Sequence, residues 1–498
     1  MNTSLPSHVD TLVIGAGPGG SAFTGVLAAG TDATVLLVEA GPDYGPQADG
    51  RWPADMLDAR TIPLSHDYDL HTTRTSGSGT LDLPRAAIVG GCSAHNGCTA
   101  SVSARFDYDE WAAKGNPGWS AAEVEPLLDR VRDAFRVRRY TMGELTPPQR
   151  AFVDAGLAAG LPFADDLDDL DAGEGIGPMP VNVVDGVRWN SAFAFLDDVR
   201  DRPNLTIRGG ARVRRLTFDG TRATGAEIEV GGEVVRVRAE RVVVAAGAYH
   251  SPAILLRSGV GPAEELAELG IETVVDLPGV GKHLLDHECV QLDFAGRPGL
   301  VEELAALGWS PDEQTIGRIR SSLCDDGPYD IHVFMVAGAN SGHPGLPPIS
   351  LYGGAMRARS EGTVTLGPDL DVVNPVIDHR YGSDPEGHDR TVLGEALALL
   401  DRMVAHPALA EILGERVGDG DPLDDIVNYC HPVGSCKMGP REDATAVVDS
   451  SGQVHGAEGL YVADASIMPS ITRGNINLPT AMIGANIAHG LLKKEAGR

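Results

Sequence analysis

The first forty residues alternate between apolar, β-branched segments and a segment of small residues. Residues 8–14 (HVDTLVI) and 34–38 (TVLLV) have the composition of buried strands, and residues 21–29 are small and compatible with a helix. A strand–helix–strand unit places its two strands parallel in one sheet. The start of the chain therefore predicts an α/β domain.

Two later regions have different patterns. Over residues 205–247, β-branched residues alternate with Gly and Asp turn signals, which predicts a β-meander returning to the sheet at 241–245. Between about 291 and 426 the pattern is mixed, with strands expected at 329–337 and 362–366 and a helix at 391–405. The tail predicts a strand at 459–463 and a helix at 480–492. Because its first and last parts suggest one sheet, the chain is expected to form two interleaved domains.

Composition and charge exclude several classes of partner. Hydrophobic residues make up 42% of the 498 residues, as in ordinary globular proteins. A formal net charge of −30 argues against nucleic-acid binding and against docking on anionic lipid. The chain has no apolar run long enough for a membrane span, and its first nine residues show no leader pattern, so a cytoplasmic protein is expected. Six cysteines without a CxxC pair predict reduced thiols and no metal site.

The turn between the first strand and helix carries a dinucleotide-binding motif. Residues 15–20 (GAGPGG) place Gly15, Gly17 and Gly20 in a G-x-G-x-x-G pattern. These glycines allow, in turn, a tight turn, close approach of a pyrophosphate and close helix packing. Glu39 ends the second strand nineteen residues after Gly20, where an acid binds a ribose hydroxyl. The motif alone does not distinguish FAD from NAD.

Five further segments resemble one enzyme family. Residues 84–97 (PRAAIVGGCSAHNG) and 247–261 (GAYHSPAILLRSGVG) are similar to the two signatures of the glucose–methanol–choline (GMC) oxidoreductases. Residues 277–287 (LPGVGKHLLDH), 428–439 (NYCHPVGSCKMG) and 460–488 resemble later segments of that family, in the same order. The resemblance covers nearly the whole chain.

The resemblance implies an α/β fold, in which a Rossmann-like FAD-binding domain is interleaved with an α+β substrate domain on a large antiparallel sheet. We assign residues 1–150, 187–290 and 430–498 to the FAD domain, and residues 151–186 and 291–429 to the substrate domain. The cofactor implied is FAD. By position in the family's motifs, the residues expected to contact it beyond the glycine turn are Glu39, Gly90, Gly91, His95, Asn96, Val213 and Asp464.

The resemblance also implies oxidation of an alcohol carbon by hydride transfer to the flavin. The hydroxyl proton must leave as well, and a neutral imidazole can accept it. His431 is the expected base. Aligning the Thr-x-Met sequence that follows makes Asn477 the residue that donates to the developing alkoxide. In choline-oxidising members a histidine at the position of His95 is joined covalently to the flavin; a buried His95 beside unlinked FAD is the alternative.

The substrate is predicted by comparing this sequence with the side chains that a choline-binding pocket needs. A quaternary ammonium needs aromatic walls and a buried carboxylate. Trp52 is expected to supply one wall, but Thr315 stands at the carboxylate position and Cys430 where an aromatic would complete the cage. A shifted alignment would restore an acid at Asp312 or Glu313. We therefore expect a neutral primary alcohol, benzylic or furanic, with a small aliphatic alcohol or polyol as the second choice.

Several alternatives stay open at this point. The electron acceptor is expected to be O2, giving H2O2, with a dehydrogenase that uses another acceptor as the alternative. Oxidation of choline and the non-redox use of FAD by hydroxynitrile lyases are others. His283 and His287 have an i, i+4 spacing, but no third ligand is evident and no metal is expected. The oligomeric state is not predicted.

Overall fold

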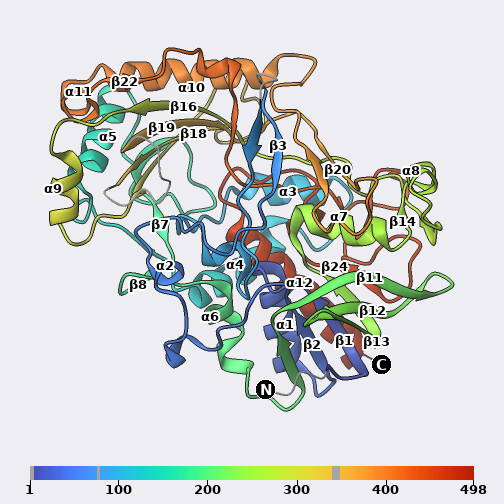
Figure 1. Ribbon diagram of the computed structural model, residues 1–498. Helices are drawn as coiled ribbons and strands as arrows, with labels where there is room; N and C mark the ends of the chain where they lie inside the picture. The colour runs from blue at the N-terminus through green and yellow to red at the C-terminus, as the bar shows by residue number, and fades with distance from the viewer. Residues whose placement is uncertain (1–4, 76–78, 339–347, 498) are drawn as a thin grey trace.

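A computed structural model describes residues 5–75, 79–338 and 348–497 and contains two large sheets (Figure 1). The strands of the first sheet are β1 (His8–Ile14), β2 (Val35–Val38), β10 (Leu205–Arg208), β11 (Ala211–Asp219), β12 (Arg222–Val230), β13 (Glu233–Val244) and β24 (Leu460–Val462). β1 lies parallel between β2 and β13, and β10 and β24 continue this parallel arrangement. β11 and β12 add antiparallel strands beyond β13.

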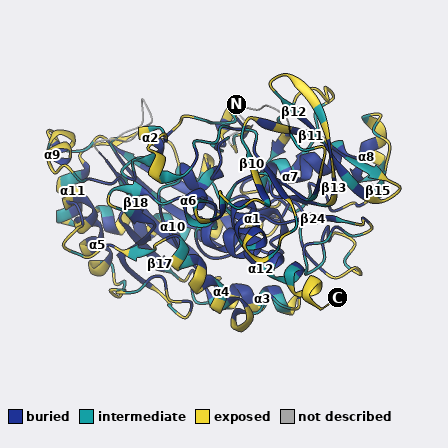
Figure 2. Cartoon of the chain, turned by 90° about the horizontal axis from the view of Figure 1, so that it is seen from below, coloured by how far each residue is buried: buried dark blue, intermediate teal, exposed yellow. Residues whose placement is uncertain are grey.

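Two helices from opposite ends of the chain pack together beside this sheet. These are α1 (Pro18–Gly30) and α12 (Asn477–Ala496). Figure 2 shows most of both helices buried, whereas the C-terminal end of α12 is exposed. The sequence predicted each helix three residues too late. α1 has Pro18 at its first position, where proline is well tolerated because its missing N–H would have no intrahelical partner.

The second sheet is antiparallel. Its strands are β6 (Gly175–Pro178), β16 (Glu288–Phe294), β17 (Thr315–Ile319), β18 (Ile331–Ala337), β19 (Ile349–Ala355), β22 (Arg416–Val417) and β23 (Val427–Asn428). α10 (His388–Val404) runs along one face, over β16, β18 and β19 (Figure 1). The interleaved α/β fold is confirmed. The domain boundaries stay a prediction; Tyr140 and Leu145 pack into the core of this second sheet.

Shorter elements connect the two sheets. The remaining helices are α2 (Ala54–Leu57), α3 (Arg105–Ala113), α4 (Ala121–Ala134), α5 (Pro147–Ala158), α6 (Ser191–Phe195), α7 (Gly247–Arg257), α8 (Ala263–Glu268), α9 (Leu300–Ala306) and α11 (Pro407–Leu413). The 3-10 helices are η1 (Gln47–Asp49), η2 (Gly91–Ala94), η3 (Asp197–Val199), η4 (Pro422–Asp424) and η5 (Ala465–Ile467). Two-stranded pairs are formed by β3 (His71–Thr73) with β4 (Thr80–Asp82), β5 (Arg138–Arg139) with β7 (Pro180–Val181), β8 (Val183–Val184) with β9 (Val187–Arg188), β14 (Val260–Gly261) with β15 (Val275–Asp276), and β20 (Thr363–Thr365) with β21 (Val376–Asp378). Within the described ranges, no helix is both long and apolar enough to cross a membrane.

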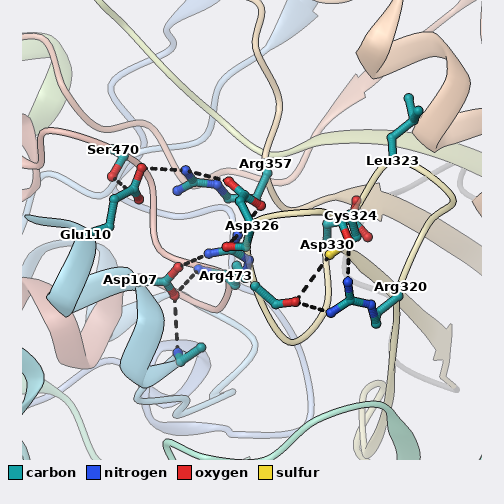
Figure 3. Close-up of polar contacts among 12 residues, drawn as sticks. Asp107, Glu110, Arg320, Leu323, Cys324, Asp326, Asp330, Arg357, Ser470 and Arg473 are labelled. Atoms are coloured by element: carbon teal, nitrogen blue, oxygen red, sulfur yellow. Dashed lines mark hydrogen bonds and ion pairs between the residues drawn. The ribbon is translucent and has the colours of Figure 1, made fainter.

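A buried arginine connects the segment before α12 to both halves of the molecule (Figure 3). The fully buried guanidinium of Arg473 lies 2.5 Å from Asp107 of α3, whose carboxylate also accepts from the backbone N–H of Arg473 at 2.8 Å. Its other terminal nitrogen donates to Asp326, in the loop after β17, at 2.6 Å. When one member of a buried ion pair is removed, the other charge stays buried without a partner, which is strongly destabilising. Arg473 therefore fixes the position of the chain that leads into α12.

Replacing Arg473→Leu should destabilise the protein by about 3–5 kcal/mol, because the Asp107 carboxylate would stay buried without a counter-charge. Arg359→Leu is the matched control, since its pair with Glu386 is exposed and should contribute at most about 1 kcal/mol. The urea midpoint of the two variants measures the difference. Equal midpoints would contradict the structural importance of the buried pair, and Asp107→Asn in the Arg473→Leu background should recover part of the loss.

Candidate active site

One continuous cavity of about 440 Å³ is lined by residues of both sheets. At one end it reaches the turn before α1, and at the other it reaches strands β18 and β19. A site at the carboxyl ends of parallel strands is the usual place for a nucleotide in such folds.

The glycine turn is shaped as its motif predicts. Gly15 has φ +97°, a backbone conformation that favours glycine. A Cβ on Gly20 would stand 1.9 Å from the carbonyl oxygen of Gly15, so the close approach of α1 to the turn requires a glycine at position 20. Gly15 and Gly17 line the cavity. Gly20 lies behind them, in the packing position. The N-terminus of α1, with its free N–H groups, is therefore available to an anionic group.

Glu39 lies in the cavity wall beside this turn. Its carboxylate accepts the backbone N–H of Ala16 and of Gly41, each at 3.0 Å. Burial raises the pKa of Glu39 to about 7. The carboxyl group is thus held rigidly where the sequence predicted a ribose contact.

The other predicted cofactor residues lie at two depths. Asp464 accepts from the backbone of Gly247 at 2.8 Å and from Ser466 at 2.8 Å, which fixes the start of η5. Gly90 is buried behind the wall and gives its N–H to Ala16 at 2.8 Å. The predicted residues that line the cavity directly are Gly15, Gly17, Glu39, Gly91, His95, Asn96, Val213 and Asp464.

The residues present fit an elongated, polar occupant such as FAD. A Cβ at Gly17 would meet nothing nearer than Gly91 Cα at 4.0 Å, so the turn is open toward the cavity. Nδ1 of His95 and both amide atoms of Asn477 are buried without a hydrogen-bond partner among the described residues. Buried polar groups are almost always paired. These atoms therefore point to a ligand that carries hydrogen-bonding groups.

His95 follows η2 in the middle of the cavity wall, close to Arg85. Burial, and then the charge of Arg85, lowers the pKa of His95 to about 3, so its ring is neutral at pH 7. Arg85 also lines the cavity, and two of its guanidinium nitrogens have no hydrogen-bond partner within the described chain. A neutral imidazole retains a lone pair, which a covalent link to a cofactor requires.

His431 and two asparagines meet at the other end of the cavity. Nδ2 of Asn475 lies 3.3 Å from Nε2 of His431, and Asn477 lines the same wall. Sequence alignment on Thr-x-Met selected Asn477 and missed Asn475. The repeated N-x-N spacing at 475–477 was the available signal.

The ring of His431 is positioned from the other side by His287. Their Nδ1 atoms are 2.9 Å apart, and the backbone N–H of His431 donates to Asp286 at 2.7 Å. Burial, followed by His287 and Arg85, holds the pKa of His431 well below its usual 6.5. His431 is therefore neutral at physiological pH and able to accept a proton. Cys430, before it, lines the cavity with φ +65°.

The carboxylate at this end comes from Glu313. Thr315 lies outside the cavity lining because its hydroxyl points to Gln149 within the core. Glu313 lies two residues before it, and a Cβ on Gly97 would stand 2.8 Å from both its carboxylate oxygens. Gly97 thus leaves the space that the carboxylate occupies. The expectation that the pocket has no counter-charge is therefore wrong.

Burial also governs the ionisation of this carboxylate. It raises the pKa of Glu313 to about 7. Burial and the nearby Glu313 raise the pKa of Asp312, which also lines the cavity, to about 8. A cation bound next to Glu313 would favour its ionised form.

Three aromatic rings stand near this carboxylate. Phe334 and Tyr352 are stacked, with centroids 4.8 Å apart and planes 8° apart, and Tyr429 lies 4.9 Å from Phe334 and 4.6 Å from His431. All three line the cavity. Trp52 does not, because its indole packs on Phe193 and donates to Gly45. The aromatic wall predicted from Trp52 is supplied by other residues.

The remaining histidines of interest have different partners. His283 pairs with Glu361 at 3.0 Å, whereas His287 contacts His431 and the carbonyl of Thr472. Their side chains are thus directed to separate neighbours, although they are four residues apart.

Known proteins resemble this chain over its whole length. Two family models described as GMC oxidoreductase match residues 9–289 and 358–484. The chain is 32% identical to choline oxidase of Arthrobacter globiformis, over 98% of this chain and 95% of that protein. It is 33% identical to an oxygen-dependent choline dehydrogenase of Brucella anthropi, over 97% of this chain and 96% of that protein. The solved structure of pyridoxine 4-oxidase from Mesorbium loti matches with a TM-score of 0.83 at 26% identity, over 97% of this chain and 99% of that one.

Proposed function

Because the chain belongs to the GMC oxidoreductase family, and is therefore an FAD-dependent enzyme acting on alcohol-type donors, we propose that it oxidises a small primary alcohol bearing a cationic nitrogen. His431 is the base, and O2 is the electron acceptor. The observation that carries the choice of substrate is the Glu313 carboxylate beside an aromatic wall.

His431 removes the hydroxyl proton of the alcohol. Its Nε2 lies at the cavity wall beside Asn475, and its lowered pKa keeps the ring neutral and ready to accept a proton. FAD, when bound, supplies the acceptor for the hydride that leaves the alcohol carbon. Asn475 and Asn477 cannot act as bases, but their amide N–H groups can donate to the oxygen as negative charge develops on it. The unpaired Asn477 amide supports this role.

Glu313 and the rings of Phe334, Tyr352 and Tyr429 would hold the cationic end of the substrate. A carboxylate and aromatic faces both attract an ammonium group, most strongly away from water. The sequence relatives named for choline support the same class. Choline is the first member of this class to test.

A neutral benzylic or furanic alcohol is the second candidate. The stacked pair of Phe334 and Tyr352 offers an aromatic surface against which a flat ring could pack. Glu313 favours the cationic substrate, since only a cation would stabilise the ionised form of this buried carboxyl group.

His431→Ala should retain bound FAD but lose about 100-fold or more in the rate of flavin reduction, because the general base is absent. Asn477→Ala should lose less, since it removes one hydrogen bond of about 1–3 kcal/mol. Anaerobic bleaching of the flavin by the alcohol measures both, and a wild-type flavin that no alcohol bleaches would favour a non-redox, lyase-type use of FAD. Near-normal reduction in His431→Ala would overturn its assignment.

Glu313→Gln should weaken choline binding by ~30-fold or more, as expected when one partner of a desolvated ion pair is removed. The neutral isostere 3,3-dimethylbutan-1-ol should be unaffected, which separates charge from shape. Asp312→Asn is the matched variant, since Oδ1 of Asp312 packs against Gly338, and it should retain most of the affinity.

The affinity for choline should also depend on pH. The pKa of Glu313 is about 7, so its carboxyl group is protonated and uncharged at lower pH. The affinity for choline should therefore rise as the pH rises through that value. The gain is about tenfold between pH 6 and 8 for one ionisation, and Glu313→Gln should abolish it. The other titratable groups near Glu313 are Asp312, Cys98, Tyr140, Tyr352 and Tyr429. A higher kcat/KM for benzyl alcohol than for choline would select the neutral candidate instead.

His95 is proposed to carry the FAD covalently, which its unpaired Nδ1 and neutral ring support. Acid precipitation of the wild-type protein should leave the yellow colour in the pellet. His95→Ala should still bind FAD through the glycine turn but release it to the supernatant, and it should show a lower flavin reduction potential. Release of all the colour by the wild type would show that the FAD is not linked.

A further inference from the structure

A second histidine forms a hydrogen bond with the proposed base from outside the reacting cavity. His287 precedes β16 and His431 follows β23, and these strands pair with Glu288 opposite Asn428. The pairing brings the two rings together edge to face, with Nδ1 atoms 2.9 Å apart and planes at 89°. His287 is fully buried and does not line the cavity.

The other partner of His287 determines which nitrogen carries its proton. Nε2 of His287 lies 2.9 Å from the carbonyl oxygen of Thr472, which can only accept. The proton of a neutral His287 ring is therefore on Nε2, and its Nδ1 has only a lone pair. Rotating the ring by 180° would put carbon atoms at both contacts.

A hydrogen bond between the two Nδ1 atoms then needs its proton from His431. With the proton on Nδ1, the remaining nitrogen of His431, Nε2, has a lone pair and no proton, so it is the acceptor of the contact with the Asn475 amide. That nitrogen lies beside the amide of Asn475 at the cavity wall. An imidazole with the opposite tautomer would present an N–H to the alcohol and could not accept its proton.

We propose that His287 is a positioning residue that holds His431 in the Nδ1–H tautomer and so directs the lone pair of Nε2 at the substrate hydroxyl. This inference rests on the proposed role of His431. The alcohol proton moves to Nε2 of His431 while the Nδ1 proton stays in place. The resulting imidazolium then donates from Nδ1 to the neutral His287, in a charge-assisted hydrogen bond.

The carbonyl that orients His287 is itself held in place. Thr472 precedes Arg473, whose buried pair with Asp107 fixes this stretch of chain (Figure 3). On the other side, one oxygen of Asp286 accepts the backbone N–H groups of both His287 and His431, at 2.8 and 2.7 Å. Both rings are therefore set by contacts that do not involve the substrate.

The test uses the FAD-loaded protein and three variants. His287→Leu removes the acceptor. His287→Gln retains a carbonyl that can accept from His431 and an amide that can donate to Thr472. His283→Asn is the control, because His283 contacts Glu361 rather than His431 and has φ +55°, which asparagine tolerates.

Two measurements follow. Nitrogen NMR of ¹⁵N-histidine-labelled protein reports which ring nitrogen of His431 carries the proton, with His431→Asn assigning the signals. Anaerobic mixing with choline and, in parallel, with benzyl alcohol gives the limiting rate of flavin reduction and the affinity for the alcohol. Melting temperature and flavin content show whether each variant is folded.

We expect wild-type His431 to be protonated at Nδ1 and not at Nε2. His287→Leu should redistribute this proton and lower the limiting rate about 10- to 100-fold, the range for losing a hydrogen bond to a charged group, with little change in alcohol affinity. His287→Gln should restore both the Nδ1 protonation of His431 and the limiting rate, and His283→Asn should leave both of these unchanged. Protonation of wild-type His431 at Nε2 would overturn the inference, as would a His287→Leu variant that keeps the tautomer. If the tautomer is as described but His431→Ala reduces its flavin normally, the proposed base is wrong although the contact exists.

Discussion

The buried pair of Arg473 and Asp107 holds the segment on which the candidate active site depends. A guanidinium with no exposed side-chain surface is tolerated only with close counter-charges, and these come from α3 and from the loop after β17. Through Asp107 and Asp326, Arg473 therefore joins α3 to the loop after β17 of the second sheet. Within the next few residues the same segment supplies Asn475 and Asn477 to the cavity, and just before Arg473 it supplies the carbonyl of Thr472 to His287. A displacement of this segment would alter these contacts together.

Burial shifts the acids and bases of the cavity in opposite directions. It raises the pKa of Glu313 to about 7 and lowers that of His431, so His431 is neutral at pH 7, and the neutral form of Glu313 is far more populated than for an exposed carboxyl group. For His431 the neutral form is the one a base needs. For Glu313 the neutral form avoids an uncompensated buried charge until a cation arrives. The same low-polarity surroundings thus suit proton removal at one point and cation binding at another.

The fold could be predicted from the family's motifs, and the geometry of the glycine turn could be predicted because its signals are local. The glycine turn, the strand that precedes it and Glu39 lie within one short stretch, and backbone geometry restricts their spacing. Helix ends were less accurate: α1 and α12 begin three residues earlier than expected. The substrate end was predicted less well. Thr315 points into the core, Trp52 packs on Phe193, and the carboxylate and aromatic rings come from Glu313, Phe334, Tyr352 and Tyr429.

The sequence by itself determined the nucleotide turn and His431 as the candidate base, because each depends on a short local motif, and it determined the family resemblance and the interleaved α/β fold, because several such motifs follow one another in the family's order. Only the tertiary structure decided which carboxylate enters the cavity and which histidine contacts His431. Glu313 depends on where β17 begins and on the space left by Gly97, more than two hundred residues earlier in the chain. The contact between His287 and His431 depends on the register of β16 against β23 across 144 residues. Strand register and side-chain direction over such separations are set by packing of the whole molecule, which no local pattern contains.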